Sequence, residues 1–205
     1  MKSTLEIYDD VFCEELLDKM GYLYAFFKQC NTNWQYDFIS KDEIADRSEE
    51  LHAQYVKDII SKLNQEDKSI VGYEAWINTM PFESKGLEYH YDCDEGEENL
   101  VTPIKTFVVY LGPPTGMVGG SLVLDVKGKY KERSYKCVYS ILEDLDDGWI
   151  QVPYKHGRVV CFDSTIPHAV LPIKKINKNE VRMTLTVAVW DKEPTIIRGD
   201  PTYAK

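Results

Sequence analysis

Residues 182–190 read Arg-Met-Thr-Leu-Thr-Val-Ala-Val-Trp, and their character alternates along the segment. Met183, Leu185, Val187 and Val189 form an apolar set, whereas the residues between them begin as Arg and Thr. Successive side chains of an extended strand point to opposite faces. The segment therefore predicts a β-strand with one apolar face and a second face that is polar where the strand begins.

Segments of the same texture recur upstream, rich in Val, Ile, Tyr, Phe and Thr and separated by Gly, Pro, Asp and Asn. The composition of these runs is typical of strands. We expect strands at residues 71–80, 87–91, 105–111, 121–126, 137–142, 149–153, 158–162, 169–173 and 181–190. Nine short strands with no helix between them predict an antiparallel sandwich or barrel.

The first third of the chain has the residue pattern of helices. Apolar residues follow Asp9 and Asp10 at the three- and four-residue spacing of an amphipathic helix, from Phe12 to Phe27. Ser40 and Glu43 have the spacing of a capping box, which predicts a second helix ending near residue 63 or 64. We expect a single domain over residues 1–205, with helical support at 1–68, a β core at 69–190 and an irregular tail at 191–205.

Composition excludes several classes of protein. The chain has 205 residues, with 24 Lys and Arg against 34 Asp and Glu, which gives a net charge of −10. So acidic a chain does not favour binding to nucleic acid. The five cysteines form no C-x-x-C pair, so we expect reduced thiols rather than disulfides or a zinc knuckle. Without an apolar leader or a run of 18 apolar residues, the expectation is a cytoplasmic protein with no membrane contact.

Two of the four histidines are candidates for a metal site. His90 and Asp92 flank Tyr91, and residues two apart on a strand point to the same face, roughly 7 Å apart. Imidazole and carboxylate ligands together suit Fe(II), Mn or Zn. His168 follows an apolar strand and a short polar turn, which would return a second imidazole to the first pair.

Structural roles for the same residues are open alternatives. His90 could end a strand beside a solvated acidic loop, and His168 could be satisfied by a backbone carbonyl. Arg182 could form a structural ion pair with one of the many acids, because a buried arginine needs an anionic partner. His52, within the second expected helix, and His156, beside Gly157, are interpreted as structural and turn residues.

Taken in order, these segments resemble the iron(II)- and 2-oxoglutarate-dependent dioxygenases, in the branch like prolyl 4-hydroxylases. The resemblance rests on the H-x-D of residues 90–92, the strand 106–111, the Gly119-Gly120-Ser121-Leu122 turn, the segment 157–172 and the strand 182–190. Together they span roughly residues 71–190. The chain departs from the family in having Asn179-Glu180-Val181 where Gly often precedes the arginine, and in a longer gap between His168 and Arg182.

The resemblance implies a double-stranded β-helix, or jelly roll, with the helices packed on one outer face. It implies Fe(II) held by His90, Asp92 and His168, with 2-oxoglutarate and O₂ as cosubstrates and room for ascorbate as an accessory reductant. Cosubstrate contacts would come from Arg182, Tyr110, Thr184 and Asn78, while Lys174 and Lys175 compete with Arg182 as the carboxylate anchor.

The activity implied is hydroxylation of an unactivated C–H bond, with a prolyl residue of a peptide or protein as the first choice of substrate. A hydroxylase of a free small molecule and a non-catalytic jelly-roll binding protein stay open as alternatives. So does a cupin-type metalloenzyme that does not use 2-oxoglutarate and would not need Arg182. The oligomeric state is not predicted by the sequence.

Overall fold

The computed structural model describes residues 4–30, 34–44, 46–47, 51–62, 69–93, 101–112, 116–127, 149–177 and 179–195. Two helices and twelve strands are assigned there. In chain order these are β1 (Leu5–Tyr8), α1 (Glu14–Cys30), β2 (Trp34–Ser40), α2 (Leu51–Lys62), β3 (Gly72–Met80), β4 (Leu87–His90), β5 (Lys105–Leu111), β6 (Val118–Gly119), β7 (Leu122–Asp125), β8 (Trp149–Val152), β9 (Val159–Asp163), β10 (His168–Val170), β11 (Ile173–Lys175) and β12 (Arg182–Trp190).

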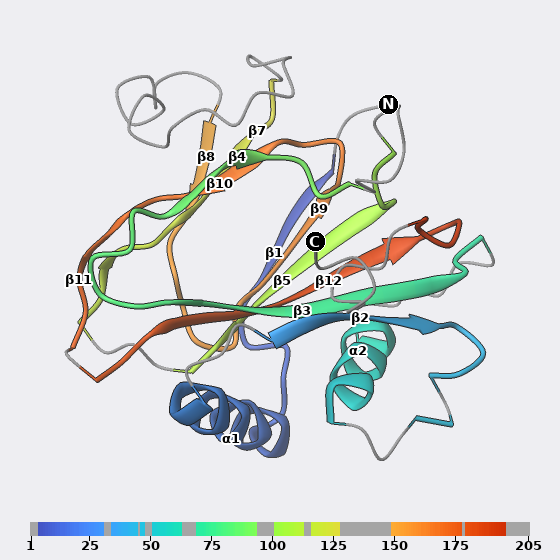
Figure 1. Ribbon diagram of the computed structural model, residues 1–205, viewed down its shortest axis with the longest axis horizontal. Helices are drawn as coiled ribbons and strands as arrows, with labels where there is room; N and C mark the ends of the chain where they lie inside the picture. Colours follow the sequence, from blue (N-terminus) through green and yellow to red (C-terminus); the bar gives the residue numbers. More distant parts are fainter. Residues whose placement is uncertain are drawn as a thin grey trace.

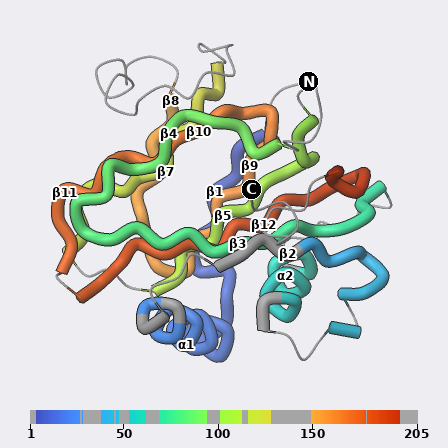
Figure 2. Tube along the Cα trace, viewed as in Figure 1, coloured from blue at the N-terminus to red at the C-terminus, as the bar shows by residue number. Residues whose placement is uncertain are grey.

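The strands form two principal sheets that face each other. The larger sheet has six strands in the order β1-β9-β5-β12-β3-β2, and the smaller has four in the order β4-β10-β7-β8. A short β11–β6 pair joins them at one end, and all pairings are antiparallel. Both helices lie on the outer face of the larger sheet, and the strands curl around a common interior (Figures 1 and 2). The expected jelly roll with helices on one outer face is confirmed.

Alternation along the central strands produces two separate cores. On β5, Phe107, Val109 and Leu111 belong to the cluster packed against the helices, whereas Val108 and Tyr110 face the space between the sheets. On β12, the apolar residues from Met183 to Val189 join the helix-side cluster. The two faces predicted for residues 182–190 are therefore both present. The apolar face packs under the helices, and the other face points to the interior of the jelly roll.

The first third of the chain contains strands that the sequence did not predict. β1 adds an edge to the larger sheet by pairing with β9, and β2 pairs with β3 at the opposite edge. The support expected at residues 1–68 thus contains the two helices α1 and α2 and, in addition, the two strands β1 and β2. Ser40 and Glu43 do exchange the two capping-box bonds, each 3.3 Å long. They close a turn, and α2 begins only at Leu51.

Most strands of the predicted β core are present within a residue or two. The segment expected at 169–173 is divided into β10 and β11, and β6 is an additional short strand. The strand expected at 137–142 lies outside the described residues, as does the end of the tail from residue 196. In the described ranges, neither helix is long and apolar enough to cross a membrane.

Candidate metal centre and adjoining cavity

Two neighbouring strands of the smaller sheet bring the two candidate histidines together. His90 is the last residue of β4 and His168 the first of β10, and the antiparallel register pairs them directly. Their ring centroids are 4.3 Å apart. Directly opposed residues in an antiparallel sheet lie close enough for their side chains to touch. Two residues 78 positions apart in the chain therefore share one point of the fold.

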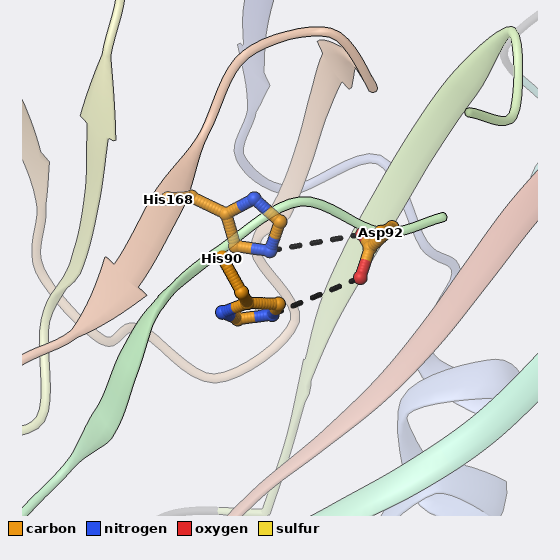
Figure 3. A group of neighbouring side chains, drawn as sticks. All are labelled: His90, Asp92 and His168. Atoms are coloured by element: carbon orange, nitrogen blue, oxygen red, sulfur yellow. Dashed lines mark ion pairs between the residues drawn. The ribbon is translucent and has the colours of Figure 1, made fainter. Parts of the chain in front are cut away.

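Asp92 completes the cluster from the segment that follows β4. Its Oδ1 lies 3.8 Å from His90 Nε2, and its Oδ2 lies 3.7 Å from His168 Nε2. Figure 3 shows the three side chains pointing toward one another. One donor atom from each residue can be chosen so that all lie within 4.8 Å of one another. The structure thus brings together the three residues expected from the H-x-D and the distant histidine.

Each of the two imidazoles has a backbone carbonyl next to its Nδ1 atom. His90 Nδ1 lies 2.6 Å from the carbonyl oxygen of Glu88, and His168 Nδ1 lies 3.3 Å from that of Ile166. A carbonyl oxygen only accepts hydrogen bonds, so each Nδ1 carries the hydrogen and each Nε2 keeps its lone pair. Ligating histidines ordinarily have such a partner on the second nitrogen. The backbone-carbonyl contact considered as an alternative role for His168 is therefore present, and it is compatible with a metal at Nε2.

The cluster fits a divalent transition metal. Two imidazoles and one carboxylate are the donors of the facial triad that leaves coordination positions open on non-haem Fe(II). Asp92 and His168 are 4% and 5% exposed, so these ligands lie inside the protein rather than on an acidic surface loop. His90 is partly exposed.

The triad lines a cavity of about 370 Å³ between the two sheets. This volume is within the usual range for small-molecule sites. Besides the triad, the walls include Arg182, Thr184 and Asn78, which come from β12 and β3 of the larger sheet. Thr184 is paired with Asn78 on one side and with Tyr110 on the other. All three predicted metal residues and three of the four predicted cosubstrate residues therefore line one space, whereas Tyr110, the strand neighbour of Thr184, is not among the lining residues.

Arg182 is a buried cation with an unusual set of neighbours. It is 1% exposed, and its Nε donates a 2.7 Å hydrogen bond to the carbonyl oxygen of Gly120. Its Cζ lies 5.5 Å and 5.8 Å from the ring centroids of Tyr110 and Tyr154. Burial lowers the pKa of the Arg182 guanidinium, and the two tyrosines oppose that shift. Within the ranges described, no acidic side chain forms an ion pair with Arg182, so the alternative of a structural ion pair is not observed there.

The hydroxyl of Tyr110 is also buried, and its polar neighbours in the described part of the chain are the Arg182 side chain and the backbone of Leu122. Burial raises the pKa of Tyr110, while the charge of Arg182 acts in the opposite direction. The phenol therefore keeps its proton and is available as a donor. Lys174 and Lys175 are exposed on β11 and neither lines the cavity, so Arg182 is the one lysine or arginine among the described residues that lines it.

Three residues near the site were missed in the sequence. Tyr154 stacks on the Tyr110 ring with centroids 4.7 Å apart. The carbonyls of Leu111, Gly112 and Met183 surround its hydroxyl as alternative acceptors for its single hydrogen. Thr106 donates a hydrogen bond to Asp92, and Ser164 bonds to Thr106. No local pattern marks these residues, because each partner comes from a distant part of the chain.

No protein-family model matches the sequence, and no curated protein does. Solved structures match over nearly the whole chain. A prolyl-4-hydroxylase from Pseudomonas putida is 18% identical with a TM-score of 0.59, over 93% of this chain and 94% of the other. The viral collagen prolyl hydroxylase of Paramecium Bursaria Chlorella virus-1, in complex with 2-oxoglutarate, is 16% identical with a TM-score of 0.54, over 90% and 94%.

A third similar structure is HygX from Streptomyces hygroscopicus with nickel and 2-oxoglutarate bound. It is 11% identical with a TM-score of 0.59, over 95% of this chain and 84% of the other. These similarities confirm that the fold is the one shared by prolyl hydroxylases and 2-oxoglutarate-binding relatives.

Proposed function

We propose that this chain is an Fe(II)- and 2-oxoglutarate-dependent oxygenase that hydroxylates an unactivated C–H bond. One observation carries the proposal. His90, Asp92 and His168 converge in the same cavity as Arg182, a buried cation that forms no ion pair with an acid in the described chain. A metal triad and a guanidinium on opposite sheets suit a ligand that chelates a metal at one end and bears a carboxylate at the other.

In this proposal His90, Asp92 and His168 hold the iron. The iron and 2-oxoglutarate, when bound, supply oxidative decarboxylation to succinate and CO₂ coupled to oxygen insertion into the substrate. The protein contributes fixed ligands, since both imidazoles have their Nδ1 atoms bonded to carbonyls. It also keeps the reacting centre away from bulk water, because Asp92 and His168 are buried.

The residues of the larger sheet would fix the orientation of the diacid. Arg182 offers the fork of donors that matches a carboxylate, and Gly120 holds the guanidinium by its Nε. Tyr110 would donate its phenolic hydrogen, and Thr184 would add a hydroxyl from the same face as Arg182. Asn78, opposite Thr184 on β3, is proposed as a further contact in the cavity.

A prolyl residue of a peptide or protein is our proposed substrate. Support comes from the prolyl hydroxylases from Pseudomonas putida and the Chlorella virus, which share the fold across nearly their whole length. The cavity is at the small end of the range for ligand sites, so it would admit one side chain beside the diacid. The similarity to HygX keeps a free small molecule as the alternative substrate class.

The test is 2-oxoglutarate turnover with added Fe(II), followed as succinate formation. We expect Asp92→Ala and His168→Ala to lose turnover while retaining the far-ultraviolet spectrum and cooperative unfolding of the wild type. His156→Gln is the matched control, because His156 lies in the turn before Gly157 and does not line the cavity. Wild-type rates in either triad variant would contradict the metal assignment. A screen of peptides and metabolites for a product heavier by one oxygen then separates the two substrate classes.

A further inference from the structure

The three candidate ligands are not held in the same way. His90 and His168 belong to paired strands, so the sheet itself fixes their backbones. Asp92 lies beyond the end of β4, in residues 91–93, where no strand pairing is assigned. A carboxylate on such a segment needs a side-chain contact if its orientation is to be fixed before a metal arrives.

Thr106 supplies that contact from the opposite sheet. Its Oγ1 donates a 2.9 Å hydrogen bond to Asp92 Oδ2, and the threonine is fully buried. Thr106 lies on β5 and is paired with Phe162 and Ala188 on its two sides, so its backbone is among the most constrained in the fold. The hydrogen bond therefore ties the segment after β4, in the smaller sheet, to the centre of the larger one.

Ser164 extends this contact to the turn that carries the second histidine. Its Oγ lies 2.8 Å from Thr106 Oγ1, and it too is fully buried. The single hydroxyl hydrogen of Thr106 points to Asp92, so Ser164 must donate to Thr106. The result is a directed chain from Ser164 through Thr106 to Asp92.

The turn holding Ser164 is itself well fixed. The Oδ1 of Asp163 accepts from the backbone nitrogen and the hydroxyl of Thr165, at 2.9 Å and 2.6 Å. The backbone nitrogen of Ile166 donates to the carbonyl of Asp163 at 2.8 Å. The carbonyl of Ile166 then accepts from His168 Nδ1. One short turn thus orients two of the three candidate ligands, one through the backbone and one through two hydroxyls.

We propose that Thr106 and Ser164 are positioning residues for the metal-binding carboxylate. They act by restricting rotation of the Asp92 carboxylate so that it faces the two Nε2 atoms without a metal present. The inference rests on the proposed function, because it assigns Asp92 as a ligand. It adds that the affinity for metal depends on two buried hydroxyls whose residues do not line the cavity.

The test is the affinity for Mn(II), measured by electron paramagnetic resonance of the free ion, with no turnover required. Loss of a group that hydrogen-bonds a ligand typically weakens metal binding by about 10- to 100-fold. We expect Thr106→Val, which keeps the shape and removes the hydroxyl, to show such a loss. Thr106→Ser keeps the hydroxyl and should bind within about threefold of the wild type. Ser121→Ala removes a buried hydroxyl that accepts from Gln151 and does not line the cavity, and it should leave Mn(II) affinity unchanged.

A double-mutant cycle separates a chain of contacts from two independent effects. Ser164→Ala should weaken Mn(II) binding about fivefold, the worth of one ordinary hydrogen bond. In the Thr106→Val background it should cause no further loss, because Ser164 acts through Thr106. If Thr106→Val does not fold, Ser164→Ala carries the test, since it removes only one oxygen atom.

The outcomes distinguish this inference from the proposed function. If the wild type does not bind Mn(II), the metal centre itself is wrong. If the wild type binds Mn(II) and Thr106→Val binds it equally well, only the positioning role is overturned. The positioning role would also be overturned if Thr106→Ser lost as much Mn(II) affinity as Thr106→Val. The same holds if Ser164→Ala weakened Mn(II) binding by its full amount in the Thr106→Val background.

Discussion

Arg182 is the residue at which stability and ligand binding make opposite demands. A buried charge is costly to desolvate, and replacing such a charge by an apolar side chain is often neutral or stabilising. The aromatic faces of Tyr110 and Tyr154 and the carbonyl of Gly120 offset part of this cost. In the proposed function the remainder is offset only when a carboxylate occupies the cavity.

Substitution of Arg182 by Met tests this balance. We expect Arg182→Met to unfold at the same temperature as the ligand-free wild type or at a higher one. Its affinity for 2-oxoglutarate in the presence of Mn(II) should fall at least about 30-fold, from loss of one partner of a buried charge pair. Isothermal titration calorimetry measures the affinity, and Lys174→Met is the control for loss of a cation outside the cavity. Unchanged affinity in Arg182→Met would show that Arg182 is not the carboxylate anchor, whereas no 2-oxoglutarate binding by the wild type would favour a metalloenzyme that does not use it.

At the residue scale, the sequence was informative where a residue type is rare and uninformative where it is common. Four histidines leave few choices, and the triad expected from His90, Asp92 and His168 is confirmed as a spatial cluster. Thr106 was passed over as an ordinary strand residue, since its partners Asp92 and Ser164 are 14 and 58 residues away. Such contacts depend on the register between strands, which a single sequence does not specify.

Among the elements, the approach of β4 to β10 depends on a glycine. Gly86 precedes β4 with a φ of 90°, and a Cβ at this position would lie 2.1 Å from the carbonyl oxygen of Val170. Both the conformation and the space exclude a side chain there. Because β4 carries His90 and β10 carries His168, this contact also bears on the metal site.

Gly86→Ala should therefore cost more than a change of backbone conformation alone. Gly116 is the matched control, since its φ is 72° and nothing lies within 4 Å of the position of its Cβ. Gly116→Ala should lower the free energy of unfolding by about 1 to 2 kcal/mol, the cost of a left-handed residue. Gly86→Ala should lower it further and weaken Mn(II) binding. Urea denaturation gives the free energy of unfolding of each variant. Equal losses of this free energy in the two variants would show that the close approach of Gly86 to Val170 is unimportant.

The edge strand β1 is held by a charged cluster at its end. Arg158 contacts both oxygens of Asp9, at 2.7 Å and 2.8 Å, and Lys155 lies 3.2 Å from the same carboxylate. These partners, led by the Arg158 hydrogen bond, lower the pKa of Asp9 from 3.8 to about 2. Arg158, part of the Gly-Arg pair in the family resemblance, therefore anchors the N-terminal segment and does not line the cavity.

The lowered pKa of Asp9 gives a defined pH window. A carboxyl whose folded pKa is below its unfolded value stabilises the protein above about pH 4 and loses this effect as the pH falls toward 2. The urea midpoint of Asp9→Asn should thus fall less between pH 5 and pH 2.5 than that of the wild type. Asp10→Asn, at a far more exposed neighbour of Lys155, should follow the wild type. Parallel curves for all three proteins would contradict the assignment.

Elements were predictable where hydrophobic periodicity was strong. β5 was predicted to the residue and β3, β4, β7, β8, β9 and β12 to within one or two, because buried strands have a distinct composition. β1 is only four residues long with two exposed positions, so its pairing with β9 leaves little trace in the sequence. The Ser40–Glu43 pair forms its bonds around a turn, which shows that a capping box alone does not start a helix.

For the whole molecule, the proposed site makes stability depend on ligands. A ligand that binds only the folded state at 100 times its dissociation constant adds about 2.7 kcal/mol. For a chain of this length that corresponds to a rise of about 5 to 10 °C in the unfolding midpoint. We expect Mn(II) with 2-oxoglutarate to produce this rise in differential scanning fluorimetry. The rise should be absent in Asp92→Ala, and no rise in the wild type at millimolar ligand would argue against the proposed function.

The alternation of β12 has a practical consequence for engineering. Residues at odd positions from Met183 to Val189 contribute to the layer beneath the helices, whereas Thr184 and Thr186 line the cavity. A mutant library confined to Thr184 and Thr186 would sample new ligand preferences with the helical layer left intact. One confined to the odd positions would vary robustness to heat and leave the cavity wall as it is. Ligand preference and thermal stability could therefore be varied almost independently on this strand, the first at its even-numbered residues and the second at its odd-numbered ones.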